Sequence, residues 1–288
     1  MGPCRLDDEL DSQVLGLAWS TGCVTAQTSD DTSADPSAVV RALRAAGCVF
    51  AEDEAALLLD AATSAADLDA RVARRVAGEP LEQVLGWAEF CGLRLQVEPT
   101  VFVPRRRTEL VVREAAARLS PGAVLVDLCC GTGAVGVAVA AHVPGIVLHA
   151  ADVDPVAVGC ARRNVEPVGG HVHEGDLDAP LPVDLRGRVD VITANAPYVP
   201  TDEVAFMPSE ARDHEARVAL DGGADGLDLH RRIAALAPGW LRSGGHLVIE
   251  TSRRQAPRTA AALTAHGMAA RVVTDDELDA TVVVGTRP

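Results

Sequence analysis

Two short segments hold the residues of this chain whose types and spacing could do chemistry. Asp127-Leu-Cys-Cys-Gly-Thr-Gly133 and Asn195-Ala-Pro-Tyr198 lie about sixty residues apart, and each ends a run rich in β-branched residues. The first is typical of a loop that holds a nucleoside-bearing cofactor, because its glycines permit a tight turn and a close approach of the backbone to a ligand. The second could hold a planar amide or amine beside that cofactor.

Acidic residues should complete the cofactor loop at the ends of the next two strands. Asp152 follows Gly133 by 19 residues, where a carboxylate can accept hydrogen bonds from a ribose diol. Asp176 could accept an adenine amino hydrogen, and Asp154 could cap the helix that begins at Pro155. A dinucleotide is the alternative ligand, because glycine turns of this kind also bind dinucleotides. The predicted cofactor-binding residues are Asp127, Cys129, Cys130, Gly131, Thr132, Gly133, Asp152, Asp176, Leu177 and Asn195.

The second segment has the acceptors that an NH₂ group needs. Pro197 forces the residue before it into an extended conformation, so the Ala196 carbonyl and the Asn195 side-chain oxygen can face the same space. Two such oxygens match the two hydrogens of a primary amide or an exocyclic amine, and Tyr198 can pack on the plane of that group. Beside a cofactor loop, this pattern indicates methyl transfer to nitrogen, with Asn195, Ala196, Pro197 and Tyr198 as predicted catalytic residues. An amide nitrogen is a poor nucleophile, so positioning should supply most of the acceleration.

Composition excludes several classes of protein. The 288-residue chain has a net charge of −15, and its basic residues are all arginine. Such acidity opposes non-specific phosphate binding, so we expect no direct nucleic-acid partner. Seven cysteines without a C-x-x-C spacing predict neither a disulfide framework nor a metal site. The N-terminus lacks the pattern of a secretion signal and no long apolar run occurs, so we expect a cytoplasmic protein without membrane contact.

The order of local patterns predicts an α/β fold behind a small helical domain. Residues 1–35 predict a disordered leader, and 36–86 a helical substrate-recognition domain whose first helix Ser37 could cap. Residues 87–106 predict a hairpin linker. Strand and helix patterns alternate over 107–288, which indicates a doubly wound, Rossmann-like sheet with an antiparallel end. His171 and His173 would lie on a solvated edge of that sheet.

From Pro80 onward the chain resembles the HemK/PrmC family of protein-(glutamine-N5) methyltransferases. The resemblance is carried by several segments: Pro80-Leu-Glu-Gln-Val-Leu-Gly86, Ala88-Glu-Phe-Cys-Gly-Leu-Arg94, Val103-Pro-Arg105 with Thr108-Glu109, Asn195-Ala-Pro-Tyr198, Glu215 with Ala219 to Leu227, and Gly244 to Glu250. It implies a class I methyltransferase fold with S-adenosylmethionine as cofactor. It also implies a protein substrate with an exposed glutamine, such as a release factor.

The chain departs from that family's pattern in three places. Cys129 replaces a glycine of the cofactor loop, and Ala196 replaces the first proline of Asn-Pro-Pro-Tyr while keeping its carbonyl. Arg106-Arg107 replaces Pro-Glu beside the expected substrate entrance and reverses the local charge. The departures favour a PrmC-related branch with its own acceptor. A nucleic-acid adenine-N6 methyltransferase and a cofactor-binding protein without transferase activity remain the alternatives.

Overall fold

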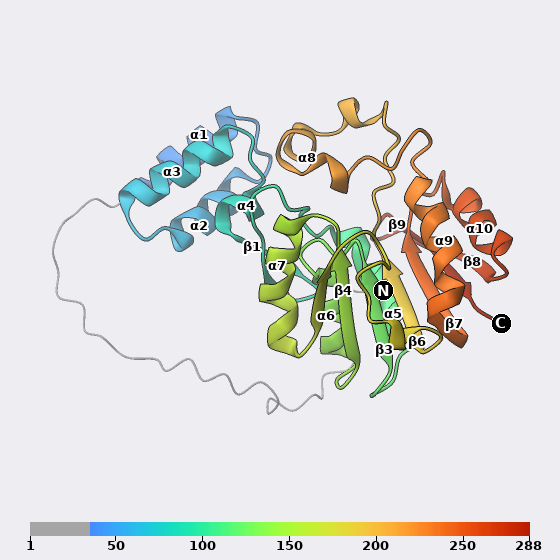
Figure 1. The fold of residues 1–288 in the computed structure, drawn as a ribbon. Helices are drawn as coiled ribbons and strands as arrows, with labels where there is room; N and C mark the ends of the chain where they lie inside the picture. Colours follow the sequence, from blue (N-terminus) through green and yellow to red (C-terminus); the bar gives the residue numbers. More distant parts are fainter. Residues whose placement is uncertain (1–34) are drawn as a thin grey trace. The chain divides into compact units, whose positions relative to one another are not determined.

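The computed structural model of the protein describes residues 35–288, and its main element is a seven-stranded sheet. The strand order is β5-β4-β3-β6-β7-β9-β8 (Figure 1). Strands β3 to β7 pair in parallel, whereas β9 runs antiparallel to both β7 and β8. The predicted doubly wound sheet with an antiparallel end is therefore confirmed. The bounds are β3 Val124–Leu128, β4 Val147–Asp152, β5 His171–Glu174, β6 Val189–Ala194, β7 Leu241–Glu250, β8 Ala269–Asp275 and β9 Ala280–Thr286.

Both faces of the sheet are covered by helices, because successive side chains of a strand point to opposite faces. In β3, Leu125 packs into one buried cluster with residues of α5, α6 and α7. Its neighbour Val126 packs into the other cluster, with residues of α9 and α10. Figure 1 shows α6 and α7 on the side of the sheet away from α9 and α10. These helices are α5 Glu109–Ala116, α6 Ala134–His142, α7 Pro155–Val165, α9 Asp228–Trp240 and α10 Ala256–Ala265.

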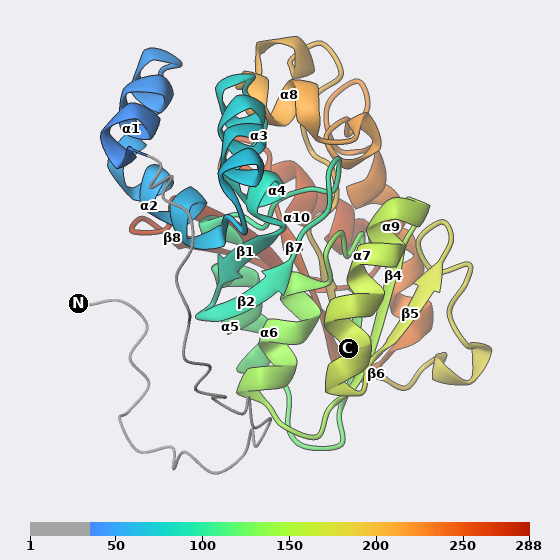
Figure 2. The same ribbon diagram turned by 90° about the vertical axis from the view of Figure 1, so that its left-hand side faces the viewer.

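The segment before the sheet forms a helical group followed by a short hairpin. Its elements are α1 Pro36–Ala45, α2 Ala51–Ala61, α3 Ala65–Val76, α4 Leu81–Leu85, β1 Trp87–Phe90 and β2 Leu93–Gln96. Figure 2 shows the antiparallel β1–β2 pair beside α4. Arg75 of α3 is buried and pairs with Glu54 of α2 at 2.6 Å and with Glu210 at 2.7 Å. Glu210 belongs to α8 (Ser209–His214), so this ion pair joins the helical group to the segment after β6.

The structure corrects some expected boundaries. The cap of α1 is Asp35 and not Ser37, because the Asp35 carboxylate accepts the Ser37 N–H at 3.0 Å and Pro36 takes the first helical position. Asp154 caps α7 as expected. The sequence patterns missed two short helices, α4 and α8. The predicted leader lies almost wholly in residues 1–34, outside the described residues.

The described residues also bear on the metal and membrane predictions. Within 35–288, no group of three or more His, Cys, Asp or Glu side chains could hold a metal ion. His173 lies on the edge strand β5, but its Nε2 is 3.0 Å from Nδ1 of the buried His149, so it is partnered as well as solvated. No helix of the described part is both long and apolar enough to cross a membrane.

Candidate active site

The cofactor loop is a tight turn between β3 and α6. Cys129, Gly131 and Gly133 all have positive φ angles, of 54°, 54° and 77°. Gly133 caps α6 in the left-handed conformation, and a Cβ there would overlap the side chain of Val165. Cys129 holds the same region of φ with a side chain, which costs about 1–2 kcal/mol. The Cys130 N–H donates to the Ala151 carbonyl at 3.1 Å, so the turn is tied to the end of β4.

Carboxylates at the ends of three neighbouring strands surround the turn. Asp152 at the end of β4 accepts the Gly131 N–H at 2.8 Å, which ties the loop to the sheet. Asp127 in β3 is almost completely buried and accepts the Thr193 hydroxyl at 2.8 Å and the Gly136 N–H at 3.1 Å. Burial raises the pKa of Asp127 to about 7. Such a carboxyl group lacks solvation for its charge, so a bound cation would favour its ionised form.

Asp176 follows β5 and differs from the other two carboxylates. Its side chain is exposed and pairs with Arg232 of α9 at 2.6 Å, an interaction that the sequence did not indicate. Leu177 next to it is buried and has a φ of 51°. Asp176 and Leu177 therefore place one charged and one apolar side chain next to each other at this end of the sheet.

One cavity of about 390 Å³ joins the cofactor loop to the Asn195 segment. Of the residues predicted to bind cofactor or acceptor, Gly133 alone is missing from the cavity wall, because it lies behind the turn against α7. The others line the cavity: Asp127, Cys129, Cys130, Gly131, Thr132, Asp152, Asp176, Leu177, Asn195, Ala196, Pro197 and Tyr198. The structure thus brings the two segments to the wall of a single cavity.

The Asn195 side chain is oriented by Thr108, to which the sequence analysis gave no role in the site. Its Nδ2 donates a hydrogen bond to the Thr108 hydroxyl at 3.3 Å, and both residues line the cavity. Because the amide nitrogen is used in this way, the Oδ1 oxygen remains to accept a hydrogen from a ligand. Thr108 is buried at the end of a 3₁₀ turn, η1 Arg106–Thr108, just before α5.

Tyr198 is held at both its hydroxyl and its backbone. The hydroxyl donates to Oε1 of Glu250 at 3.2 Å, and Arg107 donates its Nε–H to the same oxygen at 3.2 Å. Burial, followed by the charge of Glu250, raises the pKa of Tyr198 to about 12, so the phenol stays protonated. Glu250 ends β7 and is almost fully buried, which fixes this contact to the sheet.

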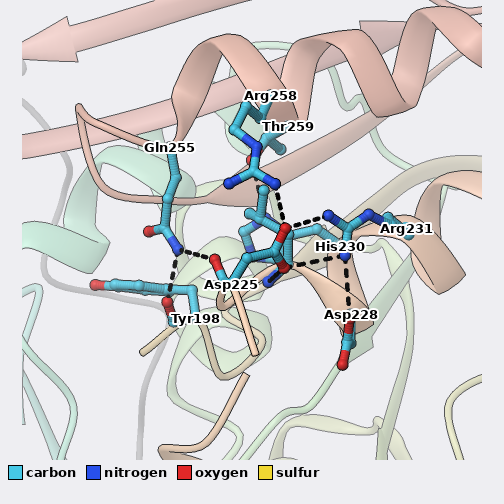
Figure 3. Close-up of polar contacts among 9 residues, drawn as sticks. Tyr198, Asp225, Asp228, His230, Arg231, Gln255, Arg258 and Thr259 are labelled. Carbon is cyan, nitrogen blue, oxygen red and sulfur yellow. Dashed lines mark hydrogen bonds and ion pairs between the residues drawn. The ribbon is translucent and has the colours of Figure 1, made fainter. Parts of the chain in front are cut away.

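The backbone of Tyr198 is clamped by Gln255, as Figure 3 shows. The Gln255 Nε2 donates to the Tyr198 carbonyl at 2.9 Å and to the Asp225 carbonyl at 3.2 Å. The Ser252 hydroxyl donates to the Gln255 side-chain oxygen at 2.5 Å and so sets which end of the amide faces the loop. A Cβ at Gly226 would overlap the Tyr198 carbonyl, which explains glycine there. Sequence reasoning matched the Ala219–Leu227 segment but gave it no role, and it passed over Gln255.

His214 and Glu215 brace the segment that leads to the cavity. Glu215 is buried, accepts the Val103 N–H at 3.1 Å and pairs with Arg105 at 2.5 Å. The His214 carbonyl accepts a hydrogen bond from Gln83 at 3.4 Å. These contacts hold residues 103–105 in place directly before the cavity-lining Arg107 and Thr108.

Comparisons with known proteins agree with this geometry. Residues 106–223 match the methyltransferase small domain family. The chain is 43% identical over 198 residues to a release factor glutamine methyltransferase of Streptomyces coelicolor, covering 66% of this chain and 70% of that protein. It is 34% identical to a 4-amino-L-phenylalanine/4-methylamino-L-phenylalanine methyltransferase of Streptomyces pristinaespiralis, covering 68% of this chain and 69% of that protein.

Solved structures agree on the fold. A methyltransferase from Pyrococcus furiosus superposes with a TM-score of 0.53 at 17% identity and covers 76% of this chain and 98% of that chain. The chain spans 65 to 70% of the length of the release factor glutamine methyltransferases most similar to it. Fold, glycine turn and sequence identity lead to one conclusion: the chain belongs to the release factor glutamine methyltransferase family, a family of S-adenosylmethionine-dependent methyltransferases.

Proposed function

We propose that this protein transfers a methyl group from S-adenosylmethionine to the side-chain amide nitrogen of a glutamine in a protein. The observation that carries the proposal is the orientation of Asn195, whose side-chain oxygen is left free by the bond to Thr108 in the cavity that also holds the cofactor loop. Family membership supports the same reaction.

The residues present fit the cofactor. Its adenosine would lie along the glycine turn, with Asp152 on the ribose and Asp176 with Leu177 at the base. Its cationic groups would favour the ionised form of the buried Asp127. When bound, S-adenosylmethionine supplies an electrophilic methyl carbon on a sulfonium.

The chain's own residues then position the acceptor. Asn195 Oδ1 and the Ala196 carbonyl accept the two amide hydrogens and hold the nitrogen lone pair toward the methyl group. The methyl carbon would bond to the nitrogen, and the electron pair of the broken S–C bond would stay on the sulfur of the methyl donor. The nitrogen, then positively charged, loses one proton to solvent. Tyr198, kept protonated and bonded to Glu250, supplies a fixed surface for the amide plane.

The helical segment 36–86 would recognise the protein acceptor. Support comes from its contacts with the segment after β6, through Arg75 with Glu210 and Gln83 with the His214 carbonyl. Met207 and Val218 of that same region line the cavity. A protein that docks on the helices would thus be coupled to the cavity wall.

The acceptor that the relatives favour is a class I release factor, methylated at a glutamine. The test is to incubate the purified protein with S-adenosylmethionine and the host's release factors, and to map methylation by mass spectrometry. Asn195→Ala should lower turnover by more than about tenfold while the dissociation constant of S-adenosylhomocysteine changes little. Thr108→Val should give a smaller loss, because it releases the Asn195 amide without removing it. Unchanged turnover in Asn195→Ala contradicts the proposed role.

A further inference from the structure

The charged side chains along the cavity are separated by sign. In the sheet order β5-β4-β3-β6-β7, the acidic cavity residues Asp176, Asp152, Asp154 and Asp127 lie at or just after the ends of the first three strands. Asp176 there is balanced by Arg232. Asn195 and Tyr198 lie in the other half of the cavity, beside β6 and β7. In that half, the charged residue of the described wall is Arg107. Apart from one guanidinium, the described wall of the acceptor half of the cavity is therefore uncharged.

Arg107 is held by the buried Glu250 and by the Tyr198 side chain, and part of its own side chain stays exposed. Its Nε donates to Glu250 at 3.2 Å, and its side chain is 43% exposed, whereas the Glu250 side chain is 1% exposed. A guanidinium is a planar fork of N–H donors that matches a carboxylate in two parallel hydrogen bonds. The buried Glu250 and Tyr198 thus orient Arg107, and the exposed part of its guanidinium can meet a ligand.

The neighbouring Arg106 adds positive charge at the same place. Most arginines of the described part pair with a carboxylate, but Arg106 is exposed and has no ion-pair partner among residues 35–288. In a chain of net charge −15, such an unbalanced cation next to the cavity wall creates a local positive field. Fields of this kind attract acidic partners and orient their approach.

We propose that the methyl acceptor carries a carboxylate close to its accepting nitrogen, and that Arg107 binds this carboxylate while Arg106 attracts it. The inference rests on the proposed function for the transfer of methyl to nitrogen. The carboxylate can come from an acidic side chain beside the glutamine of a protein, or from the α-carboxylate of a free amino acid that bears an amine. Both sources present the same group to Arg107, and the experiment separates them.

The first arm compares three peptides with one glutamine flanked by glutamate, by alanine or by lysine. A charge-assisted hydrogen bond predicts that kcat/KM for the glutamate peptide exceeds that for the alanine peptide by about 10- to 100-fold. Arg107→Met should remove this preference, and Arg107→Glu should favour the lysine peptide. Arg113→Met is the matched control, since Arg113 is half-exposed, pairs with Asp275 and is not on the cavity wall. Titration with S-adenosylhomocysteine shows that each variant is folded.

The second arm offers 4-aminophenylalanine and its carboxamide. Methylation of the free acid alone, lost in Arg107→Met, supports the carboxylate inference and overturns the glutamine acceptor. Methylation of all three peptides at equal rates, unchanged in Arg107→Met, overturns the inference and leaves the proposed function standing. Cofactor binding without methylation of a release factor, a peptide or either small acceptor overturns both.

Discussion

Removing the charge of Asp127 should stabilise the protein without cofactor and weaken its affinity for the cofactor. Asp127 is 1% exposed, and burial raises its pKa from 3.8 to about 7. Below pH 4 both the folded and the unfolded chain hold this proton, so Asp127 does not lower the stability of the fold there. Between pH 4 and 7 the unfolded chain releases the proton and the folded chain keeps it, so stability falls as pH rises. Each pKa unit corresponds to about 1.4 kcal/mol, so above pH 7 the ionisation of Asp127 lowers the free energy of unfolding by roughly 4 kcal/mol.

Asp127→Asn avoids this loss of stability, but it removes one hydrogen bond. The asparagine oxygen can still accept the Thr193 hydroxyl, but its NH₂ group then faces the Gly136 N–H. An unsatisfied buried donor costs about 1–3 kcal/mol. The variant should therefore be more stable than the parent by about 2 kcal/mol at pH 8, which raises Tm by about 4–8 °C. At pH 4 the sign should reverse, because the parent carboxyl group is then neutral as well.

Thermal melts at pH 4 and pH 8 without cofactor measure this difference in stability. Calorimetric titration measures the affinity of each variant for the cofactor. We expect Asp127→Asn to weaken S-adenosylmethionine binding by more than about tenfold, since the cofactor's positive charge loses its buried partner. Asp275→Asn is the matched control. Backbone N–H groups and Arg113 hold the pKa of Asp275 below its usual range, so this variant should lose stability at pH 8. A lower Tm for Asp127→Asn at both pH values would refute the reasoning.

Two further substitutions test the loops on either side of Asp127. Gln255→Glu places a carboxylate against the Tyr198 and Asp225 carbonyls. The repulsion should lower kcat by about 10- to 100-fold with little change in cofactor affinity. An equal loss of cofactor affinity would mean that Gln255 stabilises the whole fold and does not act on the Tyr198 segment alone. Cys129→Gly relieves a φ of 54°. The gain of about 1–2 kcal/mol exceeds the roughly 0.4–1 kcal/mol that glycine costs through the unfolded chain, so denaturant melts should show a small net stabilisation; a clear destabilisation would show that the Cys129 side chain packs favourably.

The order of elements and the position of the cofactor loop could be predicted from the sequence because both are local. Strand and helix periodicity extends over a few residues, and the turn at Gly131 and Gly133 depends on the backbone freedom of those two residues. Local patterns also led to a small error in the predicted cap of α1. Ser37 and Asp35 are both good capping residues, and only Pro36 at the first helical position decides between them.

The parts of the site that hold Asn195 and Tyr198 could not be predicted in this way. Thr108 precedes Asn195 by 87 positions, and Glu250 and Gln255 follow Tyr198 by 52 and 57. No periodicity connects residues so far apart. Tyr198 meets Glu250 and Gln255 because β6 and β7 are neighbours in the sheet, and Thr108 reaches Asn195 because α5, which directly follows it, packs against β6 and β7. The sequence by itself determined which groups could do the chemistry, and the tertiary structure decided which neighbours hold them, because the sheet order sets contacts that local patterns do not encode.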